Sequence, residues 1–76
     1  MKKIYEFLNE LHPEHDFNSN KGVIDDGVLD SFDIISLVTM IEEEYDVFVD
    51  ALDIVPENFS SVGSIANVIR KNGGMI

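Results

Sequence analysis

The 76-residue chain contains no cysteine and no tryptophan, and only five of its residues are basic. Without cysteine, the chain has no disulfide framework, no thiolate nucleophile and no zinc site of the common kinds. No apolar run reaches bilayer length, and the apolar stretch near the start ends too early for a signal peptide. We therefore expect a cytoplasmic protein that does not insert into membranes.

Acidic residues dominate the charge, because fifteen of them oppose the five basic residues and give a formal net charge of −10. This charge disfavours nucleic acid and anionic membranes as ligands, and it favours partner proteins with basic surfaces. A hydrophobic content of 45% with two prolines is typical of a folded domain. We expect one domain, residues 1–76, which is a monomer without an internal enzymatic cleft.

Apolar spacing predicts an all-α fold with three main helices, at residues 3–11, 31–45 and 62–72. Pro13 must end the first helix, Ser61 is the expected cap of the last one, and Gly73-Gly74 is its stop signal. A short helical turn is expected within 50–59. The residues predicted to face the core are Ile4, Phe7, Leu8 and Leu11, then Ile34, Leu37, Val38, Ile41 and Tyr45, and finally Val62, Ile65, Val68 and Ile69.

Residues 12–30 show no sustained period and contain Pro13, Gly22 and Gly27, so they predict a long loop between the first two helices. Five apolar residues of this loop are expected to tie it to the core: Phe17, Val23, Ile24, Val28 and Leu29. We interpret His12 and His15, near the start of the loop, as solvated residues, because no further metal ligands accompany them.

A calcium site is the other ligand that this loop suggests, since Asp25, Asp26 and Asp30 surround Gly27. An EF-hand loop has glycine at its sixth position and an acidic residue at its first. Counting back from Gly27 places Gly22 at the first position, so the spacing rejects this site. We predict no bound metal.

Ser31 opens the predicted second helix within the sequence Asp30-Ser31-Phe32-Asp33. Backbone N–H groups at a helix start lack partners, and the helix dipole favours negative charge there, so a phosphoester on Ser31 would be stabilised. The structural alternative is that Ser31 simply caps the helix, because serine and aspartate are preferred at that position.

The side of the second helix opposite its core face carries both apolar and acidic residues: Phe32, Ile35, Ser36, Thr39 and Glu43, flanked by Glu42 and Asp46. The two large apolar residues either pack under the preceding loop or form part of a docking face. The acidic run is either an ordinary solvated surface or an element of partner recognition.

The chain resembles the acyl carrier proteins, whose mark is an Asp-Ser-Leu-like tripeptide at the start of the second helix of a four-helix bundle. The similarity extends over nearly the whole chain, through Leu29-Asp30-Ser31-Phe32-Asp33, Leu37-Val38, Ile41-Glu42-Glu43-Glu44-Tyr45 and Glu57-Asn58-Phe59-Ser60-Ser61-Val62. It implies a small four-helix bundle of three main helices and one short helix, with a long loop between helices one and two.

The resemblance implies that a phosphopantetheinyl transferase attaches 4′-phosphopantetheine from coenzyme A to Ser31. The thiol of this arm would carry acyl groups as thioesters, loaded by an acyl or aminoacyl ligase and passed between acyl-transferring enzymes of fatty-acid, polyketide or related biosynthesis. By the same analogy Asp30 assists the transferase. The expected recognition surface comprises Asp30, Phe32, Asp33, Ile35, Thr39, Glu42, Glu43 and Asp46.

Two departures from the family leave the partners open, since Phe32 replaces the usual leucine and Ser36 stands where many fatty-acid carriers have an acid. The stretch Gly27 to Phe32 is also similar to D-alanyl carrier proteins, which ferry an activated amino acid. An unmodified acidic helical adaptor is the alternative from another class. We do not expect an enzyme, because no nucleophile lies beside a base on this pattern.

Overall fold

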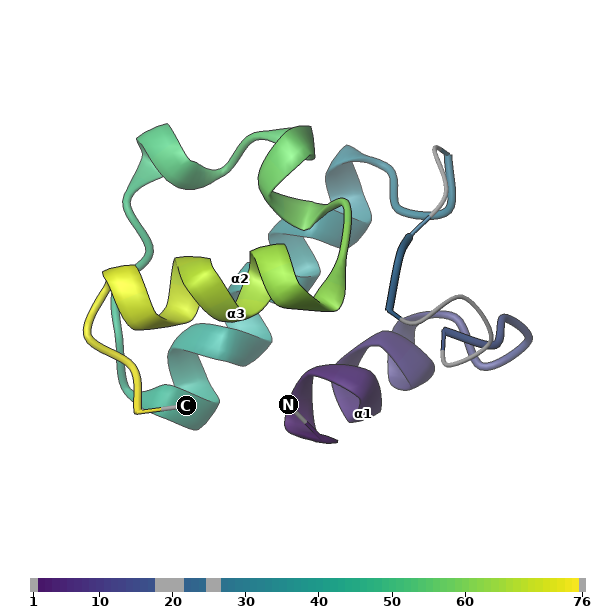
Figure 1. Ribbon diagram of the computed structural model, residues 1–76, viewed down its shortest axis with the longest axis horizontal. Coiled ribbons are helices and arrows are strands. Elements are labelled where there is room, and N and C mark those ends of the chain that lie inside the picture. The colour runs from purple at the N-terminus through teal and green to yellow at the C-terminus, as the bar shows by residue number, and fades with distance from the viewer. Residues whose placement is uncertain (1, 18–21, 25–26, 76) are drawn as a thin grey trace.

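Three α-helices form the framework of the computed structural model: α1 (Lys2–Leu11), α2 (Ser31–Tyr45) and α3 (Val62–Lys71) (Figure 1). The structure describes residues 2–17, 22–24 and 27–75. Within these ranges the only β-type pairing is an isolated antiparallel bridge between Val23 and Ser61. The prediction of an all-α fold is therefore confirmed for the described residues.

The helix ends follow the local chemistry that the sequence predicts. The bounds of α2 are those predicted, whereas α1 begins one residue earlier than expected and α3 ends one residue earlier. Ser61 caps α3, because its hydroxyl accepts a hydrogen bond from the Ser64 N–H at 3.0 Å. Beyond α3, Gly73 adopts a positive φ of 94°, which ends the helix as the Gly-Gly signal predicts.

Between α2 and α3 the chain forms two 3₁₀ helices, η1 (Ala51–Asp53) and η2 (Pro56–Phe59). Pro56 begins η2, a position where the missing proline N–H costs no hydrogen bond. The segment expected to contain one short helical turn thus contains two turns of the tighter kind. Neither is an α-helix, so the bundle has three α-helices among the residues described.

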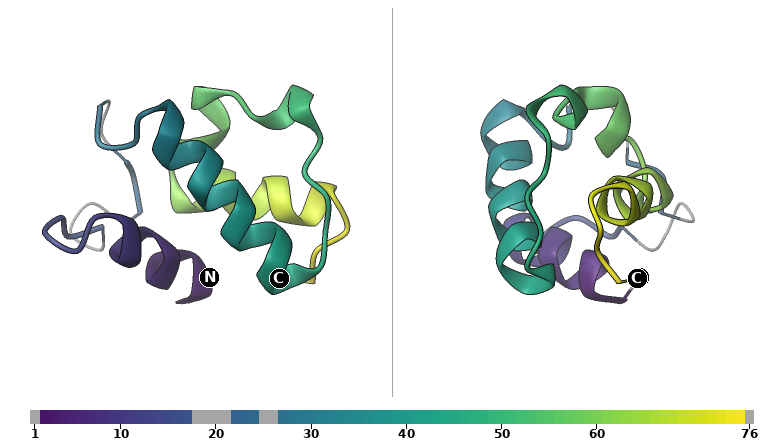
Figure 2. Two further views of the ribbon diagram at one scale, coloured as in Figure 1. Left: turned by 180° about the vertical axis from the view of Figure 1, so that it is seen from behind. Right: turned by 90° about the vertical axis from the view of Figure 1, so that its left-hand side faces the viewer.

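The core lies between α1, α2, α3 and η2. Helix α1 packs against both α2 and α3, while η2 covers parts of α2 and α3 (Figure 2). The fully buried side chains with the largest volumes are Ile4, Leu8, Leu37, Ile41, Ile65, Ile69 and Val62. No helix in the described part of the chain has the length and apolar content needed to cross a membrane.

The segment joining α1 to α2 is held to the core by Phe17 and Ile24, which are buried, and by Val28 and Leu29, which are partly buried. The prediction for Val23 is wrong, because this side chain is 48% exposed. Residues 22–24 run extended beside residues 60–62, and neighbouring side chains of an extended segment point to opposite sides. Burial of Ile24 therefore turns Val23 outward. The predicted loop residues 18–21, Asp25 and Asp26 lie outside the described residues.

Candidate functional site

Ser31 is the first residue of α2, and its side chain is exposed. Asp30 occupies the cap position before it, with extended backbone angles, and its carboxylate accepts a hydrogen bond from the Asp33 N–H at 2.8 Å. The alternative in which Ser31 caps the helix is therefore wrong. In the described part of the chain, no group hydrogen-bonds to the Ser31 hydroxyl.

A reciprocal capping box fixes the turn that carries Ser31. The Asp33 carboxylate accepts the Asp30 N–H at 3.3 Å, while the Ile34 N–H reaches the Asp30 carbonyl at 3.0 Å. The N–H groups of Ser31 and Phe32 have no intrahelical partners at this position, so they present partial positive charge. A negatively charged group attached to Ser31 would meet that charge.

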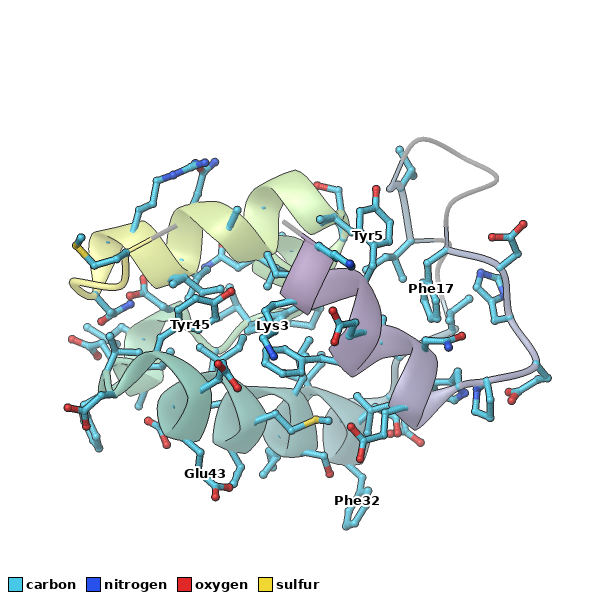
Figure 3. The ribbon with its side chains drawn as sticks, turned by 90° about the horizontal axis from the view of Figure 1, so that it is seen from below. Lys3, Tyr5, Phe17, Phe32, Glu43 and Tyr45 are labelled. Atoms are coloured by element: carbon cyan, nitrogen blue, oxygen red, sulfur yellow. The ribbon has the colours of Figure 1, made fainter. Side chains whose placement is uncertain are left out.

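The outward face of α2 carries two large apolar side chains near Ser31. Phe32 is 77% exposed and Ile35 is 61% exposed. The alternative in which these side chains pack under the preceding loop is therefore wrong. Figure 3 shows Phe32 and Glu43 projecting from the same side of α2, away from α1 and α3. Thr39 is exposed between them and donates its hydroxyl to the Ile35 carbonyl at 3.1 Å.

The acidic residues at the C-terminal end of α2 do not all face solvent freely. The Glu42 carboxylate accepts the Val49 N–H at 2.9 Å, and this bond holds the chain that leaves the helix. Asp46 is the cap, with a left-handed φ of 52°, and its N–H bonds to the Glu42 carbonyl. Glu43 is exposed and is the acidic residue of this group best placed for an external partner.

His12 contradicts the expectation of a solvated loop residue, because it connects α1 to the start of α2. Its Nε2 lies 2.7 Å from Oδ2 of Asp33, and its Nδ1 lies 3.1 Å from Oε1 of Glu14. The hydrogen bond to Asp33 is the largest cause of a raised His12 pKa, and the same bond lowers the pKa of the Asp33 carboxyl. His15 instead packs edge-on against Phe17.

The capping role of Asp33 could have been predicted from the sequence, whereas the role of His12 could not. An acidic residue three positions after an aspartate cap is a recognisable capping-box pattern, so Asp33 could have been assigned to the helix end. The contact between His12 and Asp33 spans 21 positions and has no spacing signature. Among the residues described, no group of three metal-ligating side chains converges on a possible ion.

A small hollow lies behind the start of α2, between Ile24, Leu29, Ile34 and Phe59, with a volume of about 90 Å³. Ligand pockets usually have volumes of about 300–1,000 Å³, so this hollow is not a preformed binding site. A cavity of about 680 Å³ lies between α1 and residues 13–17, and no residue of α2 lines it. The chemistry available at Ser31 is therefore that of an open surface hydroxyl.

Comparisons with protein-family models, with curated proteins and with solved structures gave no match to this chain.

Proposed function

We propose that this chain is a carrier protein whose Ser31 hydroxyl accepts 4′-phosphopantetheine from coenzyme A. The observation that carries the proposal is the exposed Ser31 hydroxyl in the first turn of α2, which has no hydrogen-bond partner among the residues described and lies within the sequence Asp30-Ser31-Phe32-Asp33. That sequence resembles the attachment site of acyl carrier proteins. When bound, the group supplies a terminal thiol that holds acyl groups as thioesters.

The residues around Ser31 fit a substrate hydroxyl better than a nucleophile of the chain's own. No histidine or lysine in the described residues hydrogen-bonds to Ser31, so an external transferase must supply the base. The Ser31 oxygen would form a bond to the phosphorus nearer the pantetheine. The phosphoric anhydride bond of coenzyme A breaks, adenosine 3′,5′-bisphosphate leaves, and the hydroxyl proton passes to the transferase.

The capping box would keep this hydroxyl in one place while partners change. Asp30 and Asp33 bind one another's backbone N–H groups, so the turn around Ser31 is ordered without using the serine side chain. An ordered attachment point restricts where the arm can begin, and this raises the local concentration of the acyl group at a docked enzyme.

The outward face of α2 would form the docking surface, which we define as Phe32, Ile35, Thr39, Glu43 and Asp46. Its exposed apolar residues lie toward the Ser31 end and its acidic residues toward the other end. A net charge of −10 steers the chain toward enzymes with basic surfaces. Weak and fast docking of this kind suits a protein that must serve a transferase, a loading ligase and acyl-transferring enzymes in turn.

Two resemblances suggest different classes of cargo for the proposed arm. Similarity to the acyl carrier proteins over most of the chain supports fatty-acyl or polyketide intermediates. Similarity at Gly27 to Phe32 supports a D-alanyl or other aminoacyl group. Intact-mass analysis of the protein isolated from its native host distinguishes them, because each cargo adds its own mass to the arm.

Incubation with coenzyme A and a phosphopantetheinyl transferase, read by intact-mass spectrometry, tests the proposal. We expect the mass of one phosphopantetheine group to be added to the wild-type chain, and peptide mapping to locate it on Ser31. The variant Ser31→Ala should stay folded and unmodified, whereas the matched control Ser60→Ala, another exposed serine, should be modified normally.

An unmodified wild-type mass with several transferases would overturn the carrier proposal and favour the unmodified adaptor. In that case Ser31→Ala would bind any partner as well as the wild type does. A mass increase that persists in Ser31→Ala would instead show that another residue is the attachment site.

A further inference from the structure

The His12 imidazole lies between carboxylates from two different parts of the chain. Glu14, in the turn after α1, contacts Nδ1 at 3.1 Å, and Asp33, in the first turn of α2, contacts Nε2 at 2.7 Å. The side chains of His12 and Asp33 are only 25% and 18% exposed, whereas that of Glu14 is 73% exposed. The contact with Asp33 is thus the more protected of the two.

This geometry requires a charged ring. A neutral imidazole has one N–H donor and one lone pair, so it can donate to only one of the two carboxylates. The imidazolium donates from both nitrogens and also neutralises part of the charge of its neighbours. Within the described ranges, the charged groups that face His12 are Glu14 and Asp33, and Asp30 contacts Asp33 through its backbone N–H.

The Asp33 carboxylate links His12 to the turn of Ser31. Its Oδ2 atom is 2.7 Å from the His12 ring and also accepts the Asp30 N–H at 3.3 Å. The same oxygen therefore belongs to the contact between helices and to the capping box. A change in the charge of His12 alters the hydrogen bonding of the residues on both sides of Ser31.

We propose that His12 is a positioning residue whose protonated ring clamps the first turn of α2 to the end of α1. Loss of the ring proton removes the positive charge and leaves a ring that can donate to only one of the two carboxylates, so the clamp weakens and Ser31 becomes a poorer acceptor as the pH rises. This second step rests on the proposed function, whereas the clamp itself does not.

The pKa shifts of His12 and Asp33 determine how the stability of the clamp changes with pH. The His12 pKa is raised above its ordinary 6.5 by the bond to Asp33, so its contribution is complete below 6.5 and is lost as the pH rises through the raised value. The Asp33 pKa is lowered from 3.8, so its contribution is present above 3.8 and is lost only in stronger acid. The clamp is closed between these limits.

Amide hydrogen exchange of the unmodified chain tests the clamp. We expect the protection of the Ile34 amide, which bonds to the Asp30 carbonyl, to fall by about fivefold as the pH rises through the His12 titration, the size of losing one capping interaction. The variant His12→Gln should have the low protection at every pH. The variant His12→Arg keeps a permanent charge and should have high protection at every pH.

His15→Gln is the matched control, because it makes the same change three positions away, at a ring that packs against Phe17. It should keep the pH dependence of the wild type. In Asp33→Asn, the His12 ring, followed by NMR, should titrate closer to its ordinary value. Equal protection of Ile34 in wild type and His12→Gln at every pH would overturn the clamp.

The rate of modification tests the second step. Dividing the wild-type rate by the His12→Arg rate at each pH cancels the transferase's own pH dependence, and this ratio should fall by about fivefold over the same range. A constant ratio would overturn the link to Ser31. If Ser31 is never modified in any variant, the proposed function fails together with this link, while the exchange data still decide the clamp.

Discussion

The Glu42 carboxylate accepts the backbone N–H of Val49 at 2.9 Å, across the turn that follows α2. Glu42 therefore has a structural role, although the sequence predicted it as part of a recognition surface or of an ordinary solvated acidic face. Val49 is buried, at 2% exposure, so the bond also fixes a core side chain. Glu43, the next residue, is exposed and has no such partner among the described residues.

Charge reversal should affect the stability of the fold differently at Glu42 and at Glu43. Glu42→Lys removes a charge-assisted hydrogen bond and should lower the free energy of unfolding by about 1–2 kcal/mol. Glu43→Lys should change it by less than about 0.5 kcal/mol, as is usual for exposed positions. Urea unfolding followed by circular dichroism measures both, and equal losses would contradict the structural role of Glu42.

The docking surface is best tested through Glu43 and Phe32, because neither change should disturb the fold. Glu43→Lys should slow transfer to Ser31 at about 0.01 M salt and have little effect at about 1 M, where charges are screened within a few ångströms. Phe32→Ala should slow transfer at both salt concentrations. Glu6→Lys, the same reversal at an exposed residue of α1, is the control; a loss as large as that of Glu43→Lys would show an effect of net charge alone.

The ion pair of Asp53 should make the fold less stable in acid. Asp53 is buried, at 7% exposure, and its carboxylate binds Lys71 at 2.8 Å and Asn72 at 3.4 Å, which joins η1 to the end of α3. The Lys71 ammonium lowers the Asp53 pKa from its ordinary 3.8. The stabilisation is therefore present above 3.8 and is lost as the pH falls through the lowered value.

The corresponding experiment compares Asp53→Asn with the wild type in urea at several pH values. The variant should be less stable at neutral pH, and the difference should shrink in acid as the wild-type carboxylate gains its proton. Glu57→Gln, at an exposed acidic residue of η2, is the control and should follow the wild-type curve. A difference that stays constant with pH would exclude Asp53 as its source.

A side chain at position 22 should destabilise the fold. The φ of Gly22 is +84°, and a Cβ atom there would lie 2.9 Å from the Tyr5 hydroxyl and 3.2 Å from Cβ of Val62. Gly22→Ala should lower the free energy of unfolding by about 2–3 kcal/mol, because backbone strain and overpacking combine. Gly27→Ala, with φ of +88° and open space around it, carries the strain alone and should cost about 1 kcal/mol. Thermal melts that rank them equally would contradict the packing argument.

Local patterns predicted the helices because each depends on residues within a few positions. The apolar period of α2 gave its bounds, and Ser61 gave the start of α3. The exposure of Phe32 and Ile35 follows from the same period, since the core face of α2 lies opposite.

The contacts between distant segments could not be predicted in this way. His12 and Asp33 are 21 positions apart, and Glu42 and Val49 meet only because α2 ends in a left-handed Asp46. Such pairs depend on the path of the chain between helices, which periodicity does not describe. The resemblance to acyl carrier proteins points to Ser31, but not to the histidine that holds the neighbouring turn.

The pairing of residues 22–24 with residues 60–62 has a consequence for biosynthesis. The Ile24 N–H bonds to the Ser60 carbonyl, and the Val62 N–H bonds to the Gly22 carbonyl, each at 2.8 Å. During translation α1 and α2 leave the ribosome before residues 60–62, the partner of residues 22–24, have emerged. The nascent chain therefore cannot complete these two bonds until Val62 has emerged, so final folding waits until α1, α2 and both 3₁₀ helices have left the ribosome.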